Sequence, residues 1–350
     1  AEIKLPFSQE EIKKILVVNL GGMGDFLLSL SAIKALREYY KEPELVLLTI
    51  PRAKAIAEEY PYFNAVRGLD FKLFPALNTL LGLRKIKFDL AINMRMLLSC
   101  KSALKMALLL SIVGAKYTAG RNTSGRGFFL DVKVPEDDIG TLPEYQYDLD
   151  TMKVLGIQAE FSLPEVPIAQ GDSAYIDTFL NEHHIRQEDM IIGINPFAPW
   201  QAKCWPPENF AEVIHALKRE FNCKIVITGS RDEVNAALRL KDLAKTELAI
   251  ASGKTTFGQL AALIKKCSVY ITNDTGPMHL AAILRVPLVA LFGGGYLKRF
   301  DPRNISEKAI VLHKDVDCSP CNKLKCRSMK CLKEITPQEV IDAVKSLLAP

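Results

Sequence analysis

Short, almost wholly apolar runs alternate along this chain with longer segments whose apolar positions recur at helical spacing. In the first half, strands are expected at 15–20, 44–50 and 88–94, and helices at 26–39, 52–59 and 97–113. Strands that are apolar on both faces and separated by helices indicate parallel sheets covered on both sides. The pattern therefore predicts an α/β protein with doubly wound parallel sheets.

A second series of the same kind begins after a stretch rich in proline and polar residues at 161–172, which is the predicted linker. Strands are expected at 190–195, 224–229, 268–272 and 288–292, and helices at 208–220, 233–244 and 256–265. Two domains, 1–165 and 166–350, are therefore predicted to face each other across a cleft. The last helix, 337–348, could pack on the second domain or back on the first.

Composition and charge narrow the function classes. Of the 350 residues, 49% are hydrophobic and 24% charged, as in ordinary globular α/β proteins. No apolar run reaches the ~18 residues of a membrane span, and no secretory signal pattern opens the chain. A cytoplasmic location is therefore expected.

The charge is unevenly distributed along the chain. Residues 1–135 hold 20 Lys or Arg against 12 Asp or Glu, whereas the remainder holds 25 against 28. The basic first half favours an anionic partner such as an acidic lipid headgroup or a phosphorylated glycan, with an ordinary lysine-rich surface as the alternative. No nucleic-acid-binding motif accompanies the charge, so nucleic acid is not an expected partner.

The run 273–282 places a small-residue turn between a predicted strand and a predicted helix. Backbone N–H groups and the positive end of the helix dipole suit a phosphate at such a turn. Thr275 adds a hydroxyl, Gly276 allows close backbone approach, and His279 is a second donor. An ordinary capped turn between strand and helix is the alternative.

The first strand ends in a second glycine-containing turn. Gly22 and Gly24 let a ligand approach the backbone, and Asp25 can either cap the following helix or act as a general base. A dinucleotide fingerprint would need a small residue at Leu27 and an acidic residue after the second strand, and both are missing.

Two further turns offer charged side chains. Lys203 lies among apolar and aromatic residues, where one cation could offset a diphosphate, although a surface lysine is the alternative. In the turn 228–233, the carboxylate of Glu233 could accept ribose hydroxyls, and a helix cap explains this turn nearly as well. The run 253–255 is not a P-loop, because Leu248 replaces the required glycine.

Taken in order, these motifs resemble glycosyltransferase family 9, the ADP-heptose:lipopolysaccharide heptosyltransferases. The similar stretches are Gly-x-Gly-Asp, Asn-Pro…Ala-Lys-x-Trp-Pro, Gly-Lys-Thr…Ala-Ala-Leu-Ile and Asn-Asp-Thr-Gly-Pro-Met-His-Leu-Ala, within about Ile15 to about Val344. The resemblance implies the GT-B fold, with two Rossmann-like domains that bind the acceptor and the nucleotide sugar respectively. It also implies inversion at the anomeric carbon without a catalytic metal.

The resemblance carries roles for particular residues. Asp25 would deprotonate the acceptor hydroxyl, and Lys203 would hold the donor diphosphate. The other expected donor contacts are Glu233, Asp274, Thr275, Gly276, Met278 and His279. The expected acceptor contacts are Gly22, Gly24, Arg121 and Arg126. Together with Lys101, Lys105 and Lys116, the two arginines fit an anionic lipid-linked glycan, with peripheral contact at the inner face of the cytoplasmic membrane.

Some positions depart from the family pattern near the expected donor site, namely Phe197, Cys204 and the run 293–298. They leave a different nucleotide sugar, such as a UDP-sugar, as an alternative donor. A non-catalytic nucleotide-sugar-binding protein is a second alternative, and the retention of Asp25 and Lys203 argues against it. A nicotinamide dehydrogenase is disfavoured by the incomplete fingerprint.

Four cysteines fall close together near the C-terminus, at Cys318, Cys321, Cys326 and Cys331. Thiols at such spacing favour a structural zinc or iron site over disulfides in a cytosolic chain, with a disulfide pair or free thiols as alternatives. A catalytic role is not expected, and no cofactor is expected to be required for catalysis.

Overall fold

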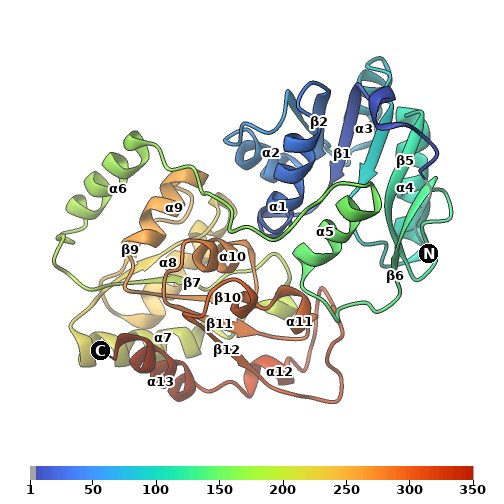
Figure 1. Cartoon of the computed structure of the whole chain (residues 1–350). Coiled ribbons are helices and arrows are strands. Elements are labelled where there is room, and N and C mark those ends of the chain that lie inside the picture. The colour runs from blue at the N-terminus through green and yellow to red at the C-terminus, as the bar shows by residue number, and fades with distance from the viewer. Residues whose placement is uncertain (1–4, 350) are drawn as a thin grey trace. The chain divides into compact units, whose positions relative to one another are not determined.

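The computed structural model describes residues 5–349. The chain divides between Pro164 and Glu165 into two units, which are called unit 1 and unit 2 below. Each unit contains one six-stranded, wholly parallel sheet with helices packed on it (Figure 1). The predicted α/β class with doubly wound parallel sheets is therefore confirmed.

The sheet of unit 1 has the strand order β3-β2-β1-β4-β5-β6. Its strands are β1 (Lys14–Asn19), β2 (Glu44–Thr49), β3 (Ala65–Gly68), β4 (Leu90–Asn93), β5 (Tyr117–Thr123) and β6 (Val132–Glu136). The chain builds outward from β1 in one direction and from β4 in the other. The boundary between β1 and β4 is thus a topological switch point, where the crevice outside the strand ends is a usual ligand site.

The helices of unit 1 cover both faces of this sheet. They are α1 (Met23–Tyr39), α2 (Pro51–Ala57), α3 (Leu73–Arg84), α4 (Cys100–Val113) and α5 (Glu144–Val154). Helix α1 packs against α2 and α5, whereas α3 packs against α4. Leu16 and Val18 of β1 share one buried core with Leu83 of α3 and Met106 of α4.

Unit 2 repeats the topology with the strand order β12-β11-β10-β7-β8-β9. Its strands are β7 (Ile191–Asn195), β8 (Lys224–Ile227), β9 (Ala249–Ile250), β10 (Val269–Asn273), β11 (Leu288–Phe292) and β12 (Ala309–His313). Counted in chain order within the unit, this is the same arrangement as in unit 1. The switch point of unit 2 therefore lies between β7 and β10.

Helices likewise cover the sheet of unit 2. They are α6 (Gln170–Glu182), α7 (Pro207–Phe221), α8 (Val234–Ala244), α9 (Phe257–Lys265), α10 (Gly276–Ile283), α11 (Leu297–Phe300), α12 (Lys330–Lys333) and α13 (Pro337–Leu348). Helix α13 packs on α7 and on the strands β10, β11 and β12. Its apolar face, including Val340, Ile341 and Val344, is buried in the core of unit 2.

One structural finding bears on the predicted boundaries. Helix α6 already begins at Gln170, so the predicted linker 161–172 is shorter than expected at its C-terminal end. Within residues 5–349, no helix is both long and apolar enough to cross a membrane.

Candidate active site

The turn after β1 places Asp25 at the switch point of unit 1. Asp25 is the third residue of α1, and its Oδ2 accepts a hydrogen bond from the Gly22 N–H at 3.0 Å. Asn19, the last residue of β1, accepts from the Gly21 N–H at 3.2 Å. These two bonds close the turn and fix the carboxylate at the N-terminal end of the helix, where a negative charge is favourable.

Arg95 reaches the same point from the turn after β4. Asn93 holds this turn: its Oδ1 accepts from the Arg95 N–H at 3.1 Å, and its Nδ2 donates to the Arg95 carbonyl at 2.8 Å. The guanidinium Nη1 of Arg95 forms an ion pair with Asp25 Oδ1. The side chains of Asp25 and Arg95 are 24% and 28% exposed, so solvent and small polar groups reach the pair.

Gly21 makes room for this ion pair. A Cβ at this position would lie 2.3 Å from the Cβ of Asp25 and 2.7 Å from Nη1 of Arg95. At Gly22 the nearest atom to such a Cβ is Asp25 Oδ2, at 4.0 Å. Close packing at the switch point therefore requires a glycine at 21. The predicted ligand contacts Gly22, the N-cap of α1, and Gly24, its second residue, are both partly exposed.

Arg121 lies at the centre of a buried charge cluster in unit 1. Its Nη1 lies 2.8 Å from Glu144 Oε1 and 3.6 Å from Asp148 Oδ1, and its Nε donates to Glu136 Oε2 at 3.1 Å. Burial would lower the pKa of Arg121, but the three carboxylates outweigh this effect and raise it. With 1% of its side chain exposed, Arg121 ties α5 to β5 and β6. The prediction that it contacts the acceptor directly does not fit this burial.

The cluster acts electrostatically on Arg95. Burial would lower the pKa of Arg95, yet Asp25 and Glu144 raise it, with Arg121 opposing them. Arg126, the other arginine predicted to contact the acceptor, is partly buried and donates from Nη1 to the Leu97 carbonyl at 3.3 Å. It thereby links the 124–131 connection to the turn between β4 and α4.

The switch point of unit 2 also holds an ion pair. Lys203 ends the 3₁₀ turn Gln201–Lys203 after β7, and Asp274 directly follows β10. Lys203 Nζ lies 2.5 Å from Asp274 Oδ2, and the two side chains are 18% and 4% exposed. The sequence prediction named both residues, and the structure brings them together.

Two aromatic rings lie near the Lys203 ammonium group. Nζ lies 5.0 Å from the centroid of the Trp200 ring and 6.0 Å from that of Phe300 in α11. At these distances the ring faces attract a cation. The His279 ring lies 6.1 Å from Phe300, so the same aromatic group links this buried histidine to the lysine.

The predicted phosphate turn forms the start of α10. Thr275 is the N-cap residue, and Gly276 begins the helix; both are partly exposed. Met278 and His279 are buried, at 0% and 4% exposure. The accessible part of this motif is therefore its turn, while the Met278 side chain belongs to the core.

Glu233 lies in the connection from β8 to α8. Its Oε2 accepts from the Ser230 N–H at 2.6 Å, so the carboxylate caps the 3₁₀ turn Arg231–Glu233. In this structure Glu233 therefore acts as a helix cap, which is the alternative interpretation of the turn. Since β8 is the neighbour of β7, the turn that carries Glu233 shares the carboxyl edge of the sheet with Lys203.

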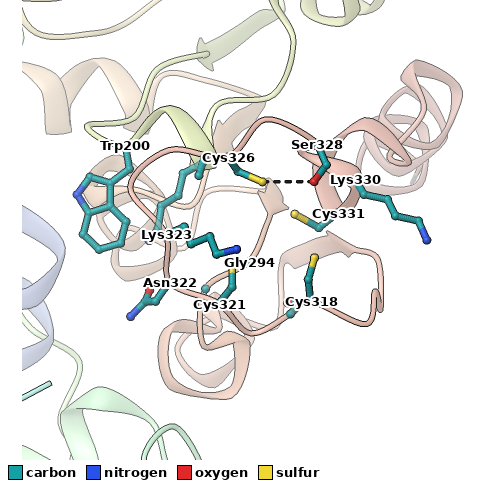
Figure 2. A pocket seen from close by; sticks show the side chains of 14 residues that line it. Trp200, Gly294, Cys318, Cys321, Asn322, Lys323, Cys326, Ser328, Lys330 and Cys331 are labelled. Atoms are coloured by element: carbon teal, nitrogen blue, oxygen red, sulfur yellow. Dashed lines mark hydrogen bonds between the residues drawn. The ribbon is translucent and has the colours of Figure 1, made fainter. Parts of the chain in front are cut away.

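The four C-terminal cysteines line one small cavity together with Trp200, Lys203 and Gly294 (Figure 2). All four are free thiols. Within the described residues, no group of three or more His, Cys, Asp or Glu side chains is arranged to hold a metal ion. As placed, the thiols do not form the ligand set of the predicted zinc or iron site.

The thiols of this cluster differ in acidity. A hydrogen bond with Ser328, at 3.4 Å, lowers the pKa of Cys326 (Figure 2). Burial raises the pKa of Cys331, and the neighbouring thiols add to this effect. Elsewhere, burial raises the pKa of Cys223 to about 11 and that of Cys267 to about 12, as expected for cysteines within the core.

The segment 318–331, called the cysteine loop below, braces the turn that carries Lys203. The Cys326 N–H donates to Gln201 Oε1 at 3.0 Å, and the Ala202 N–H donates to the Leu324 carbonyl at 3.3 Å. Cys321 and Asn322 both donate backbone N–H groups to the Gly294 carbonyl, at 2.8 and 2.9 Å. This bracing role is one that the cysteine spacing alone does not reveal.

Two residues at the switch points escaped the sequence prediction. Arg95 follows a predicted strand that neighbours the first one, so the rule that such positions gather at one sheet edge could have found it. Phe300 lies in a short helix without a strong pattern, and only the three-dimensional structure brings it to Lys203.

Comparison with known proteins gives the class. The sequence model of glycosyltransferase family 9 (heptosyltransferase) matches residues 80–332, and the chain belongs to this family. It is therefore a glycosyltransferase, and the predicted GT-B fold is confirmed by the structural matches below.

Particular relatives cover nearly the whole chain. The lipooligosaccharide heptosyltransferase 2 of Campylobacter jejuni is 28% identical over 333 residues, covering 93% of this chain and 95% of that protein. A family 9 glycosyltransferase structure from Veillonella parvula matches with a TM-score of 0.77 and 24% identity, covering 96% and 97%. The structure of Escherichia coli ADP-heptose LPS heptosyltransferase II matches with a TM-score of 0.72 and 23% identity, covering 96% and 98%.

Proposed function

We propose that this chain transfers heptose from ADP-heptose to an inner-core lipopolysaccharide acceptor, with inversion at the anomeric carbon and without a catalytic metal. Family membership supports the reaction class, and the names of the relatives support heptose and the lipopolysaccharide acceptor. The observation that carries the proposal is the pair of salt bridges at equivalent switch points, Asp25–Arg95 and Lys203–Asp274.

Unit 1 takes the acceptor in this proposal. An anionic group of the acceptor exchanges for Asp25 as the partner of Arg95, which frees Oδ1 of the carboxylate for the acceptor hydroxyl. Asp25 then accepts the hydroxyl proton as the oxygen attacks the anomeric carbon. Gly22 and Gly24 provide close backbone approach, and Arg126 supports the neighbouring turn.

Unit 2 takes the nucleotide sugar. The donor diphosphate exchanges for Asp274 as the partner of Lys203, and the N–H groups at Thr275 and Gly276 add the favourable end of the α10 dipole. As the glycosidic bond to the diphosphate breaks, negative charge develops on the leaving oxygen. A fixed cation at that point stabilises the transition state, which is the role of a metal ion in other transferases. Glu233 binds the ribose hydroxyls, and His279 supports the sugar side of the site.

A thermal-shift panel with ADP, UDP, GDP and NAD tests the donor assignment. Stabilisation by ADP, lost in Lys203→Ala, is the expected result, because only a nucleotide-bound native state gains stability from the ligand. A larger shift with UDP would keep the site but replace the donor. Metal independence is tested by measuring transfer from ADP-heptose in the presence of a chelator, where activity should persist. Inversion is tested by determining the anomeric configuration of the product by NMR.

A further inference from the structure

An exposed apolar surface covers one side of unit 1. In the described part of the chain, fifteen large apolar side chains are exposed, and nine of them fall within residues 71–128. Phe74 and Leu73 in α3 are 77% and 76% exposed, and Leu108 and Leu104 in α4 are 62% and 60% exposed. The α3–α4 face comprises Phe71, Leu73, Phe74, Leu77, Leu81, Leu98, Leu104, Leu108 and Phe128.

Core packing does not account for these side chains. Helix α3 buries only Leu80 and Leu83, whereas its other large apolar residues, Leu73, Phe74, Leu77 and Leu81, are exposed. Helix α4 buries a separate set that includes Ala103 and Met106. Because α3 and α4 pack against each other, their outward apolar residues belong to one surface. Contiguous exposed apolar surface of this kind marks an interaction site in a stable protein.

The charge around the face is strongly one-sided. Between residues 71 and 128 the only acidic residue is Asp89, against ten basic ones. Arg121 is buried among carboxylates and Arg95 is paired with Asp25, so neither adds to the charge of the face. The other eight are Lys72, Arg84, Lys85, Lys87, Lys101, Lys105, Lys116 and Arg126. Lys101 and Lys105 are exposed on α4 beside Leu104 and Leu108, so cations and apolar side chains alternate on the same helix surface.

The face begins at the edge of the sheet that carries Asp25. Helix α3 follows β3, and α4 follows β4, so both start at the carboxyl edge of the parallel sheet. Leu98 lies three residues after Arg95 in the same turn, and Arg126 of the Phe128 connection donates to the neighbouring Leu97 carbonyl. An apolar rim therefore adjoins the position where the proposed function puts the acceptor hydroxyl.

We propose that the α3–α4 face docks unit 1 on an anionic phospholipid bilayer. Its apolar side chains enter the boundary between headgroups and acyl chains, while Lys101, Lys105 and their neighbours contact the phosphates. Apolar residues alone would also fit a second copy of this chain. However, a symmetric contact between two such faces would bring their basic residues together without acidic partners, whereas an anionic membrane complements both features. The docking itself does not depend on the proposed function, but its placement beside a lipid-linked acceptor does.

Vesicle co-sedimentation of the full chain tests the docking. The wild type is expected to bind vesicles of phosphatidylethanolamine with phosphatidylglycerol, to bind phosphatidylcholine vesicles weakly, and to dissociate as salt is raised. Combining Phe74→Ser with Leu108→Ser should weaken binding at least about tenfold, because two large side chains no longer enter the bilayer. Combining Lys101→Glu with Lys105→Glu should abolish the preference for anionic vesicles.

Leu238→Ser combined with Leu243→Ser is the matched control, since both leucines are exposed, at 46% and 45%, on α8 of unit 2. This variant should bind vesicles like the wild type. The proposal would be overturned if the wild type did not bind anionic vesicles. It would also be overturned if the variant combining Phe74→Ser with Leu108→Ser bound them as tightly as the control. So would a wild-type dimer in light scattering that these variants dissociate without any vesicle binding.

Transfer to a deacylated acceptor free in solution separates this proposal from the proposed function. The Phe74 and Leu108 variant should retain that activity while losing vesicle binding. If the wild type binds vesicles but transfers no sugar, the docking holds and the assigned reaction fails.

Discussion

Units 1 and 2 share one strand order, yet the ion pairs at their switch points have opposite polarity. In unit 1 the acidic residue, Asp25, follows the first strand, and the basic residue, Arg95, follows the fourth. In unit 2 the basic residue, Lys203, follows the first strand in chain order, and the acidic residue, Asp274, follows the fourth. One topology thus presents a carboxylate at the end of a helix in one unit and an ammonium group in the other.

The surroundings of the two pairs differ as much as their polarity. Behind Arg95 lies the buried cluster of Arg121 with its carboxylates, whereas Lys203 faces the rings of Trp200 and Phe300. The unit 1 pair is also the more exposed of the two, since Asp274 is 4% exposed and Asp25 is 24% exposed. We infer that the same fold position supports proton transfer in unit 1 and charge stabilisation in unit 2.

Replacing Asp25 should have the largest effect on turnover. Asp25→Asn keeps the size of the side chain and an oxygen that can accept from the Gly22 N–H. The amide cannot take a proton, so kcat should fall by about 10²–10⁴. Steady-state transfer kinetics check this result. Turnover within a few-fold of wild type would show that the carboxylate is only a helix cap.

Removing the buried cation should have the largest effect on stability. Arg121→Met takes the positive charge away from Glu136, Glu144 and Asp148, and should reduce the free energy of unfolding by about 3–5 kcal/mol. Chemical denaturation followed by circular dichroism measures the change. Arg303→Met is the control, because its ion pair with Asp301 lies half-exposed at the surface and should contribute little.

Replacing Lys203 should affect the donor step. Lys203→Ala removes the cation that offsets the leaving group, so kcat/KM for the nucleotide sugar should fall by about 10²–10³. The KM for the acceptor should change little. A variant that instead raised only the KM for acceptor would reverse the roles assigned to the two units.

The turn before α1 offers a smaller and sharper contrast. Gly21→Ala would place a Cβ 2.3 Å from the Asp25 Cβ and should reduce stability by about 1–3 kcal/mol through overpacking. Gly22→Ala meets its nearest atom only at 4.0 Å and should leave the melting temperature nearly unchanged. Equal melting temperatures for both variants would mean that the turn is looser than described.

The sequence predicted many of the elements with clear periodicity, but it missed the apolar strand β12 and helix α6 as well as several elements with a weak pattern. Strand β11 is an uninterrupted apolar run, and β1 has four apolar residues between Lys14 and Asn19; both were located to within one residue. By contrast, β3 has only four residues, including Arg67, and Pro135 interrupts the short alternation of β6, so both strands are weakly marked in the sequence. Helix α3 was missed because leucines occur on its exposed side as well as its buried one, and Pro75 lies in its first turn.

The sequence singled out site residues that lie in motifs, and it could not show which charged residues are buried. Asp25, Lys203 and Asp274 follow strands within recognisable turns, and the structure brings the last two together. Nothing in the sequence distinguishes Arg121 from an arginine at the surface. Its burial beside Glu136 and Glu144 becomes evident only in the structure. The contact of Arg95 with Asp25 joins residues 70 positions apart, which no local pattern encodes.

Calorimetric binding of ADP to the wild type, Asp25→Asn and Lys203→Ala tests the opposite roles of the two units most directly. The account predicts unchanged affinity for Asp25→Asn and a loss of at least about tenfold for Lys203→Ala, since one charged hydrogen bond contributes about 1.5–3 kcal/mol. Weaker ADP binding in Asp25→Asn, together with unchanged binding in Lys203→Ala, would contradict the assignment of the donor to unit 2.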